Sequence, residues 1–178
     1  MDLRVKKTKN SIVSAFLELR AQKPLEKITV KELAEAAMIN KATFYLHYKD
    51  IYDLSESLEL EVVQSIMNDL TNAEKIFTDT AVFTKELTDA YIAQSNLIHT
   101  LFSGSNANQL PQRIEESVKE FVFEKYPHLR DDMEYNVMLS FSIYGGYYAF
   151  SKNSHYGVEP VSSLIGTLSE AVRTKIEP

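Results

Sequence analysis

Apolar residues recur at spacings of three and four positions along almost the whole of this chain. This spacing places them on one side of an α-helix, whereas a half-buried strand alternates apolar and polar residues with a period of two. Glycine and proline, which interrupt helices, occur only five times each in 178 residues. The sequence therefore predicts an all-α fold of about nine helices, with no strand.

Closely spaced helix starts mark the N-terminal region. Thr8 can cap a first helix that ends before Pro24. Thr29 begins a Thr-x-x-Glu capping box and starts a second helix, and Asn40 can cap a third that runs to about Tyr48. The two caps lie only eleven residues apart, a spacing that is typical of a helix-turn-helix.

The rest of the chain predicts five longer helices. Their expected ranges are Asp53 to Asn72, Val82 to Thr100, Pro111 to Tyr126, Asp131 to Lys152 and Pro160 to Ile176. Gly145 and Gly146 interrupt the fourth of these, either as a kink or as a point of close packing. The apolar face expected on the last helix consists of Val161, Leu164 or Ile165, Leu168 and Val172.

Composition excludes several classes of protein. No apolar run approaches the roughly 18 to 20 residues that span a membrane. Met1 is followed directly by charged sequence rather than by a secretory signal. The chain contains no cysteine, which excludes disulfides, thiolate zinc sites and cysteine nucleophiles. We expect a cytoplasmic protein without membrane contact.

Charge is divided unequally along the chain. Residues 1–53 contain ten Lys or Arg and seven Asp or Glu, a net charge of +3. Residues 54–178 contain nine and eighteen, a net charge of −9, and the two sum to the −6 of the whole chain. Only the first segment suits a polyanion, although a difference this small also arises by chance. Charge therefore favours residues 1–52 over residues 53–178 as the part of the chain that contacts a nucleic acid.

The side chains of the two short helices are divided as a helix-turn-helix requires. Ala34 allows close helix crossing, Ile39 in the turn can fill the core, and Phe44 shares a buried face with Tyr48. Residues 41–43 are left on the exposed first turn, where side chains reach base edges in a major groove. Any one of these residues alone is more often an ordinary packing or surface residue, but their joint register favours the functional interpretation.

The segment Ile28–Leu54, ITVKELAEAAMINKATFYLHYKDIYDL, resembles the TetR family of bacterial repressors. The likeness consists of the I-T-V start, the alanines at positions 34 and 37, the T-x-Y-x-H-[FY] core, and the Lys, Asp and Leu at positions 49, 53 and 54. It covers about residues 5–60, and beyond them only the helical pattern and the chain length are similar. The resemblance implies a sequence-specific transcriptional repressor that binds an inverted-repeat operator as a homodimer and is released by an effector.

The resemblance also implies roles for single residues. Family positions that approach bases correspond to Lys41, Ala42 and Thr43. Those that touch phosphates correspond to Thr29, Tyr45, His47 and Lys49, and the cap Asn40 completes the candidate DNA-binding set. A basic N-terminal arm would contact backbone or minor groove through Arg4, Lys6, Lys7 and Thr8, although such a tail can also be merely solvated.

Two positions depart from the family pattern. Met38 stands where the family usually has glycine, so the backbone there must avoid or tolerate a left-handed conformation. Ile51 stands where a lysine is common, which would remove one phosphate contact per subunit and flatten the salt dependence of binding.

We expect residues 53–178 to form a helical regulatory and dimerisation domain. One helix-turn-helix contacts few base pairs, so affinity normally requires two copies. By resemblance, helices at about 131–152 and 160–176 form a four-helix bundle across a two-fold axis. The family binds its effector in this domain, and the candidate lining residues are Tyr91, Phe102, Phe121 and Tyr144. The alternative is that these aromatic residues belong to a dimer interface or to the core. The effector could also be a protein or a peptide rather than a small molecule.

An enzyme is not expected. The sequence has no glycine-rich phosphate loop, no nucleophile elbow and no cluster with metal-ligand spacing, and the closest two histidines, His128 and His155, are 27 residues apart. No metal or cofactor is expected. The alternative is a helical adaptor with the same fold that acts through a protein partner and does not bind DNA specifically.

Overall fold

The protein is helical throughout the part that the structure describes. The structure, a computed structural model, describes residues 3–70 and 75–173. The described residues form ten α-helices and four short 3-10 segments and contain no strand, which confirms the all-α prediction. The helix ends expected at Asn72 and Ile176 lie outside the described residues.

The α-helices follow one another along the chain with short connections. Their bounds are α1 Leu3–Gln22, α2 Val30–Ala36, α3 Lys41–Tyr45, α4 Ile51–Asp69, α5 Lys75–Thr78, α6 Thr80–Ala93, α7 Ser95–Leu101, α8 Gln109–Lys125, α9 Met133–Asn153 and α10 Val158–Arg173. The 3-10 segments are η1 Leu25–Lys27, η2 Gly104–Asn106, η3 Pro127–Asp131 and η4 Ser154–Tyr156.

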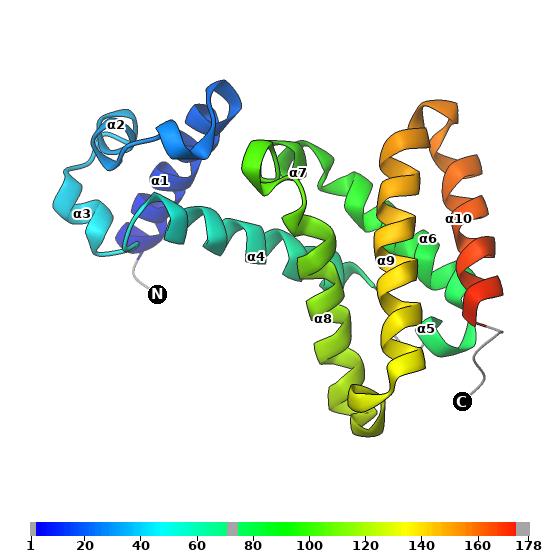
Figure 1. The fold of residues 1–178 in the computed structure, drawn as a ribbon. Coiled ribbons are helices and arrows are strands. Elements are labelled where there is room, and N and C mark those ends of the chain that lie inside the picture. The colour runs from blue at the N-terminus through cyan, green and yellow to red at the C-terminus, as the bar shows by residue number, and fades with distance from the viewer. Residues whose placement is uncertain (1–2, 71–74, 174–178) are drawn as a thin grey trace. The chain divides into compact units, whose positions relative to one another are not determined.

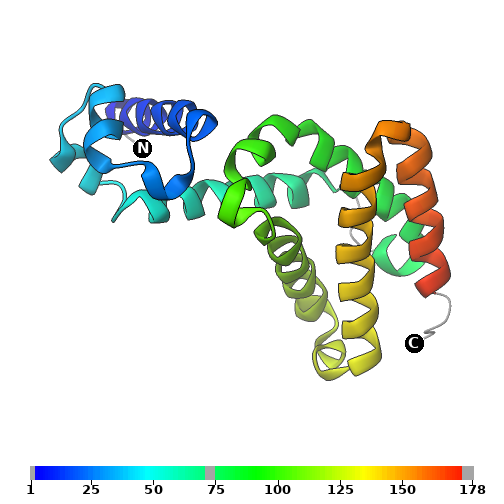
Figure 2. The ribbon, with the colours of Figure 1, turned by 45° about the horizontal axis from the view of Figure 1, so that its top comes forward.

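The chain forms two compact units, and the first is built from two separate stretches. Unit 1 comprises residues 1–61 and 96–107, and unit 2 comprises residues 62–95 and 108–178. In unit 1, α2 packs against both α1 and α3, as the blue to cyan helices of Figure 2 show. Its core contains fully buried side chains from each of these helices and from α4. They are Ile12, Phe16, Leu33, Phe44 and Leu54.

A buried polar network joins the two stretches of unit 1. The guanidinium of Arg20, on α1, donates to the carbonyl of Leu101 at 3.2 Å and to the Ser103 hydroxyl at 2.9 Å. On α4, the carboxylate of Glu59 accepts hydrogen bonds from Ser55 at 2.8 Å and from the Asn106 amide at 2.9 Å. Arg20 and Glu59 are 5% and 2% exposed, so the hydrogen bonds offset the cost of burying their charges.

The turn between α2 and α3 is a Schellman motif with methionine at the left-handed position. Met38 has φ 54° and is 93% exposed. The amide of Ile39 donates to the carbonyl of Ala34 at 2.9 Å, and that of Met38 donates to the carbonyl of Glu35 at 3.2 Å, the two bonds that define the motif. The chain therefore tolerates the left-handed conformation that glycine adopts without strain.

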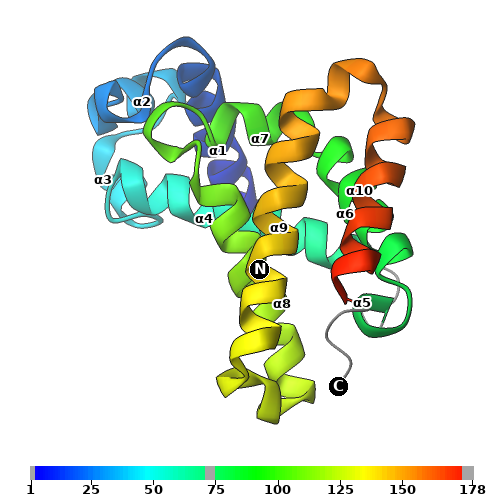
Figure 3. The same ribbon diagram turned by 45° about the vertical axis from the view of Figure 1, so that its right-hand side comes forward.

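Unit 2 is a bundle in which α10 packs against α6 and α9, and α9 also packs against α8 (Figures 1 and 3). Small residues allow these approaches. A Cβ atom placed on Gly166 would lie 3.1 Å from the carbonyl oxygen of Ala81 on α6, and one on Gly146 would lie 3.3 Å from Ile165 on α10. Gly146 is thus a packing contact within unit 2 rather than a kink, and α9 continues through it.

Other details of the helix predictions were wrong. Thr8 does not cap a helix: α1 begins five residues earlier, and the Thr8 hydroxyl donates to the carbonyl of Arg4 at 3.0 Å. The helix expected from Val82 to Thr100 is broken at Gln94 into α6 and α7. The third helix ends at Tyr45, three residues before its expected end.

The packed face of α10 agrees with the expected apolar stripe at Ile165 and differs from it elsewhere. Its buried residues are Ser162, Ile165, Gly166 and Ser169. Leu164 and Leu168 instead are 60% and 57% exposed. Small residues face the bundle because α10 lies close to α6, and the larger leucines are left on the outer face.

Candidate nucleic-acid interface

The helix α3 is anchored to unit 1 by one face. The ring of Phe44 is fully buried and that of Tyr48 is 7% exposed, with the two ring centroids 5.8 Å apart. Burial, followed by the negative charges of Glu61 and Asp53, raises the pKa of Tyr48. The phenol therefore stays neutral at physiological pH, and this aromatic pair fixes the orientation of the opposite face.

The opposite face of α3 is open to solvent. Lys41 and Ala42 are exposed, and Thr43 is half-buried. Beyond them, the side chains of Tyr45 and Leu46 are 57% and 83% exposed. The face of residues 41–43, which the sequence analysis predicts to contact bases, is thus not covered by other described residues of the chain.

Both predicted N-caps are present. The Asn40 side-chain oxygen accepts from the Thr43 amide at 2.7 Å and from the Thr43 hydroxyl at 2.9 Å. The Thr29 hydroxyl accepts from the Glu32 amide at 3.2 Å. The carboxylate of Glu32 binds the Lys23 ammonium at 2.6 Å, where a full capping box would direct it back to the cap. Because the Thr43 hydroxyl donates its proton to Asn40, its oxygen can still accept a hydrogen bond from another group.

The segment after α3 is held by the start of α4. The Lys49 amide donates to the Asp53 carboxylate at 2.9 Å, and the Asp53 amide donates to the Asp50 carboxylate at 2.9 Å. These bonds fix the backbone of Lys49, whose side chain is exposed. Ile51 is 5% exposed and contributes to the core, so this departure from the family pattern exchanges a surface cation for buried apolar area.

Three further candidate residues lie around this surface. Thr29 and Tyr45 are exposed, and His47 is half-buried with its ring centroid 6.4 Å from that of Tyr48. Leu46, which the sequence analysis did not single out, is the most exposed apolar residue of the surface, and no sequence signal distinguishes it from a core leucine.

The basic N-terminal residues belong to α1 and do not form an extended arm in the described structure. Arg4, Lys6 and Lys7 are exposed on the first turns of the helix, and Thr8 is half-buried. The Lys9 ammonium lies 5.8 Å from the centroid of the Tyr48 ring, within the range of a cation–π contact. The start of α1 is thus packed against the residue that anchors the end of the motif.

Comparison with protein families identifies this unit. Residues 12–58 match the model of a family described as bacterial regulatory proteins, tetR family. The N-terminal segment is a TetR-family helix-turn-helix domain. The match indicates a DNA-binding transcription regulator. Neither the comparison with curated proteins nor that with solved structures found a match.

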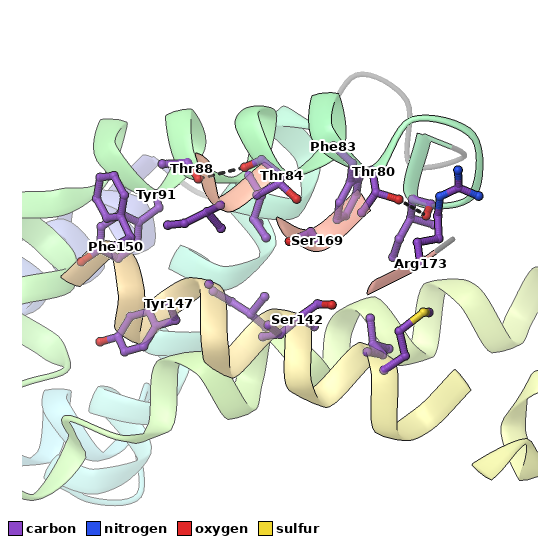
Figure 4. Close-up of a pocket in the computed structure, with 18 residues that line it drawn as sticks. Thr80, Phe83, Thr84, Thr88, Tyr91, Ser142, Tyr147, Phe150, Ser169 and Arg173 are labelled. Carbon is purple, nitrogen blue, oxygen red and sulfur yellow. Dashed lines mark hydrogen bonds between the residues drawn. The ribbon is translucent and has the colours of Figure 1, made fainter. Parts of the chain in front are cut away.

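Outside this domain, unit 2 contains a cavity of about 100 Å³ between α6, α9 and α10 (Figure 4). Its lining is mostly apolar, with rings at one end and hydroxyl groups along α6. The lining residues are Ile76, Thr80, Phe83, Thr84, Leu87, Thr88, Tyr91, Ile114, Met138, Leu139, Ser142, Ile143, Gly146, Tyr147, Phe150, Ile165, Ser169 and Arg173.

Of the four residues expected to line an effector pocket, the structure places Tyr91 at this cavity. Phe102 is buried in unit 1, and Phe121 is half-buried on α8. Tyr144 faces Glu115 of α8, and burial together with that carboxylate raises the pKa of its phenol. The spacing of Thr80, Thr84 and Thr88, four residues apart on one helix face, is the signal that could have located the cavity.

Unit 2 also exposes apolar side chains on its last two long helices. On α9, Met133, Val137 and Phe141 are 74%, 63% and 65% exposed at intervals of four residues. On α10, Leu164 and Leu168 are also more than half exposed. Among the described helices none is long and apolar enough to cross a membrane. Within the described residues no group of three or more His, Cys, Asp or Glu could hold a metal ion.

Proposed function

We propose that this protein is a transcriptional repressor that binds an inverted-repeat operator as a homodimer and is released by an effector bound in unit 2. The DNA contacts would lie in residues 1–52, and residues 53–178 would supply dimerisation and regulation. One observation carries the proposal: the exposed face of residues 40–49 is held outward by the buried pair Phe44 and Tyr48.

The exposed face has the chemistry that DNA recognition needs. Lys41 and Thr43 offer a cation and a hydroxyl to base edges from the first turn of α3, and the Leu46 side chain can contact a thymine methyl group. The exposed side chains of Tyr45 and Lys49 would contact flanking phosphates. Base contacts and backbone contacts would therefore come from one short segment.

The exposed apolar stripe of α9 and α10 supports the homodimer. Five large apolar side chains more than half exposed to water on two adjacent helices are a typical protein interface. Pairing these helices with their copies would bury the stripe in a four-helix bundle with two-fold symmetry. The two DNA-binding units would then read half-sites about 34 to 36 Å apart, or a multiple of this distance.

An adaptor that acts through a protein partner is the second candidate. The exposed Leu46 and Tyr45 would serve a protein interface as well as a DNA interface. The exposed lysines at positions 41 and 49 favour DNA, because cations release bound counterions from the phosphate backbone.

Selection from random duplex DNA tests the proposal directly. We expect the selected sequences to contain an inverted repeat, and the affinity to fall steeply with salt concentration. Replacing Tyr45 by Phe or Lys49 by Gln should weaken binding to all duplexes alike. Replacing Lys41 by Gln or Thr43 by Val should change which bases are preferred.

The adjacent exposed residue Met38 supplies a control, because Met38→Leu alters no proposed contact. Recovery of a single asymmetric half-site would contradict the dimeric mode of binding. Failure to bind any duplex at low ionic strength would refute DNA binding and favour the adaptor.

A further inference from the structure

We propose that the cavity of unit 2 binds an uncharged, elongated and mainly apolar molecule whose polar atoms are neutral hydrogen-bonding groups. This inference rests on the proposed function only in that it makes the cavity the effector site. It follows from the charge, the length and the hydroxyl groups of the lining.

The lining offers a ligand no uncompensated charge. Among the lining residues that the structure describes, none is Asp, Glu, Lys or His, and Arg173 is the one cation. The Arg173 guanidinium is paired with the carboxylate of Glu170, with Nε 3.2 Å from Oε1 and 3.3 Å from Oε2. An ionic ligand would leave water for an apolar site without a counter-ion, which costs several kcal/mol.

The cavity is long and narrow. It follows one face of α6 from Thr80 to Tyr91, which is about 16 Å at the helical rise of about 1.5 Å per residue. Its volume is about 100 Å³. A volume this small spread over such a length fits a slender chain better than a bulky ring system.

Hydroxyl groups form a polar strip on one side of this slot. Figure 4 shows Thr80, Thr84 and Thr88 in a row along α6. The Thr80 hydroxyl donates to the carbonyl of Ile76 at 3.1 Å, and that of Thr88 donates to the carbonyl of Thr84 at 2.8 Å. Their oxygens can therefore accept from a ligand hydroxyl while their own protons stay engaged.

Aromatic rings form the end of the slot farthest from Arg173 (Figure 4). The ring of Tyr91 meets those of Tyr147 and Phe150 edge to face, with centroids 6.2 Å and 5.9 Å away. Burial raises the pKa of both tyrosines, so the end is neutral as well as apolar. An alkyl terminus fits this end of the cavity, because an alkyl group gives up no hydrogen bonds to water when it is buried.

Three probes that share one chain and differ in charge test the inference. Decan-1-ol, decanoate and decylammonium are titrated near neutral pH into the full-length protein and followed by calorimetry. We expect saturable binding of decan-1-ol, and binding of both charged probes to be at least about tenfold weaker, since each tenfold is about 1.4 kcal/mol.

A pair of matched variants on α9 locates the binding site. Ser142→Leu fills the slot and should weaken the binding of decan-1-ol about tenfold or more. Ser151→Leu places the same side chain on an exposed position of the same helix, outside the cavity lining, and should leave binding unchanged. Circular dichroism establishes that both variants are folded.

Several outcomes would overturn the inference. Tighter binding of decanoate, lost in Arg173→Gln, would make the ligand an anion. Tighter binding of decylammonium would make the aromatic end a cation site. If none of the three probes bound, the inference that the cavity takes an uncharged apolar ligand would be refuted. DNA binding is measured separately, so a protein that ignores duplex DNA but prefers decan-1-ol refutes the proposed function and leaves this inference standing.

Discussion

At the scale of single residues, Met38 carries a strain that one substitution should relieve. Its left-handed φ of 54° costs a side chain about 1–2 kcal/mol, which is only partly offset by the lower entropy of a non-glycine residue in the unfolded chain. We expect Met38→Gly to raise the free energy of unfolding by about 0.5–1 kcal/mol, measured by urea denaturation.

The control for Met38→Gly is Ala36→Gly, which places glycine at an exposed position with right-handed helical backbone, only two residues away. That variant should lose about 1 kcal/mol. Equal destabilisation by both glycines would show that Met38 is not strained.

Tyr135 carries a buried hydroxyl group that should be dispensable. Its side chain is 7% exposed and stacks on Phe77, but its oxygen has no hydrogen-bond partner among the described residues. We expect Tyr135→Phe to be as stable as the parent or up to about 1–2 kcal/mol more stable, because it removes an unpaired buried polar atom. Tyr148→Phe, which breaks a 3.0 Å bond to Asn108, should instead lose about 0.5 kcal/mol.

The same substitution should change the response to alkali. Burial raises the pKa of the Tyr135 phenol. As the pH rises past about 10, this tyrosine therefore ionises in the unfolded chain before it ionises in the folded protein. The free energy of unfolding falls above that pH. Tyr135→Phe should show a smaller loss of stability between neutral and alkaline pH than the parent does.

The caps show which single residues can be predicted from the sequence. Thr29 and Asn40 were identified because a hydroxyl or amide side chain three residues before an amide has a specific bonding geometry. Thr8 was assigned wrongly as a cap, because a threonine inside a helix can bond to the carbonyl four residues before it. Local chemistry offers both alternatives, and the packing of the surrounding helix selects one.

At the scale of helices, the contact between α6 and α10 depends on a glycine. A Cβ on Gly166 would lie 3.1 Å from a backbone oxygen and 3.2 Å from the Cα atom of Ala81, neither of which can move without shifting α6. We expect Gly166→Ala to destabilise the protein by about 1–3 kcal/mol in thermal or urea unfolding. Ser163→Ala, on the exposed face of α10, should stay within about 0.5 kcal/mol of the parent.

Helix existence was easier to predict than helix limits or packed faces. The capped helices α2 and α3 were expected where they occur, since each start has a chemical signal. The break at Gln94 has no glycine or proline to mark it. On α10 the buried face is lined by serine and glycine, so the hydrophobic pattern pointed to the outer face. Interhelical distance decides such faces, and the distance is a tertiary property.

At the scale of the whole molecule, the proposed dimer depends on the outer leucines of α10. Replacing Leu168 by lysine puts a charge in the centre of an apolar interface, so we expect the dimer to weaken by about 2 kcal/mol or more. Light scattering after size-exclusion chromatography would show this as a shift from dimer to monomer. Affinity for the full inverted repeat should fall much more than affinity for an isolated half-site.

Leu60→Lys makes the same substitution at an exposed leucine of α4 and should leave the oligomeric state unchanged. A parent protein that is monomeric at micromolar concentration, or a Leu168→Lys variant with the mass of the parent, would contradict the proposed interface.

The N-terminal surface was predictable from the sequence and the cavity was not. The motif lies within one short segment, so spacing alone places its exposed and buried residues. The cavity collects residues from five helices, α5, α6, α8, α9 and α10, and only Tyr91 among its expected lining residues belongs to it. Counting aromatic residues could not locate a space that depends on how helices cross.

The first unit closes only when the chain returns to it with residues 96–107, which supply the partners of Arg20 and Glu59. Engineers often exchange DNA-reading modules between regulators by fusing fragments end to end. Here a graft of residues 1–61 alone would leave the Arg20 guanidinium and the Glu59 carboxylate without the hydrogen-bond partners that residues 96–107 supply. A working chimera would have to contain both residues 1–61 and residues 96–107, with the segment from the other regulator inserted between them.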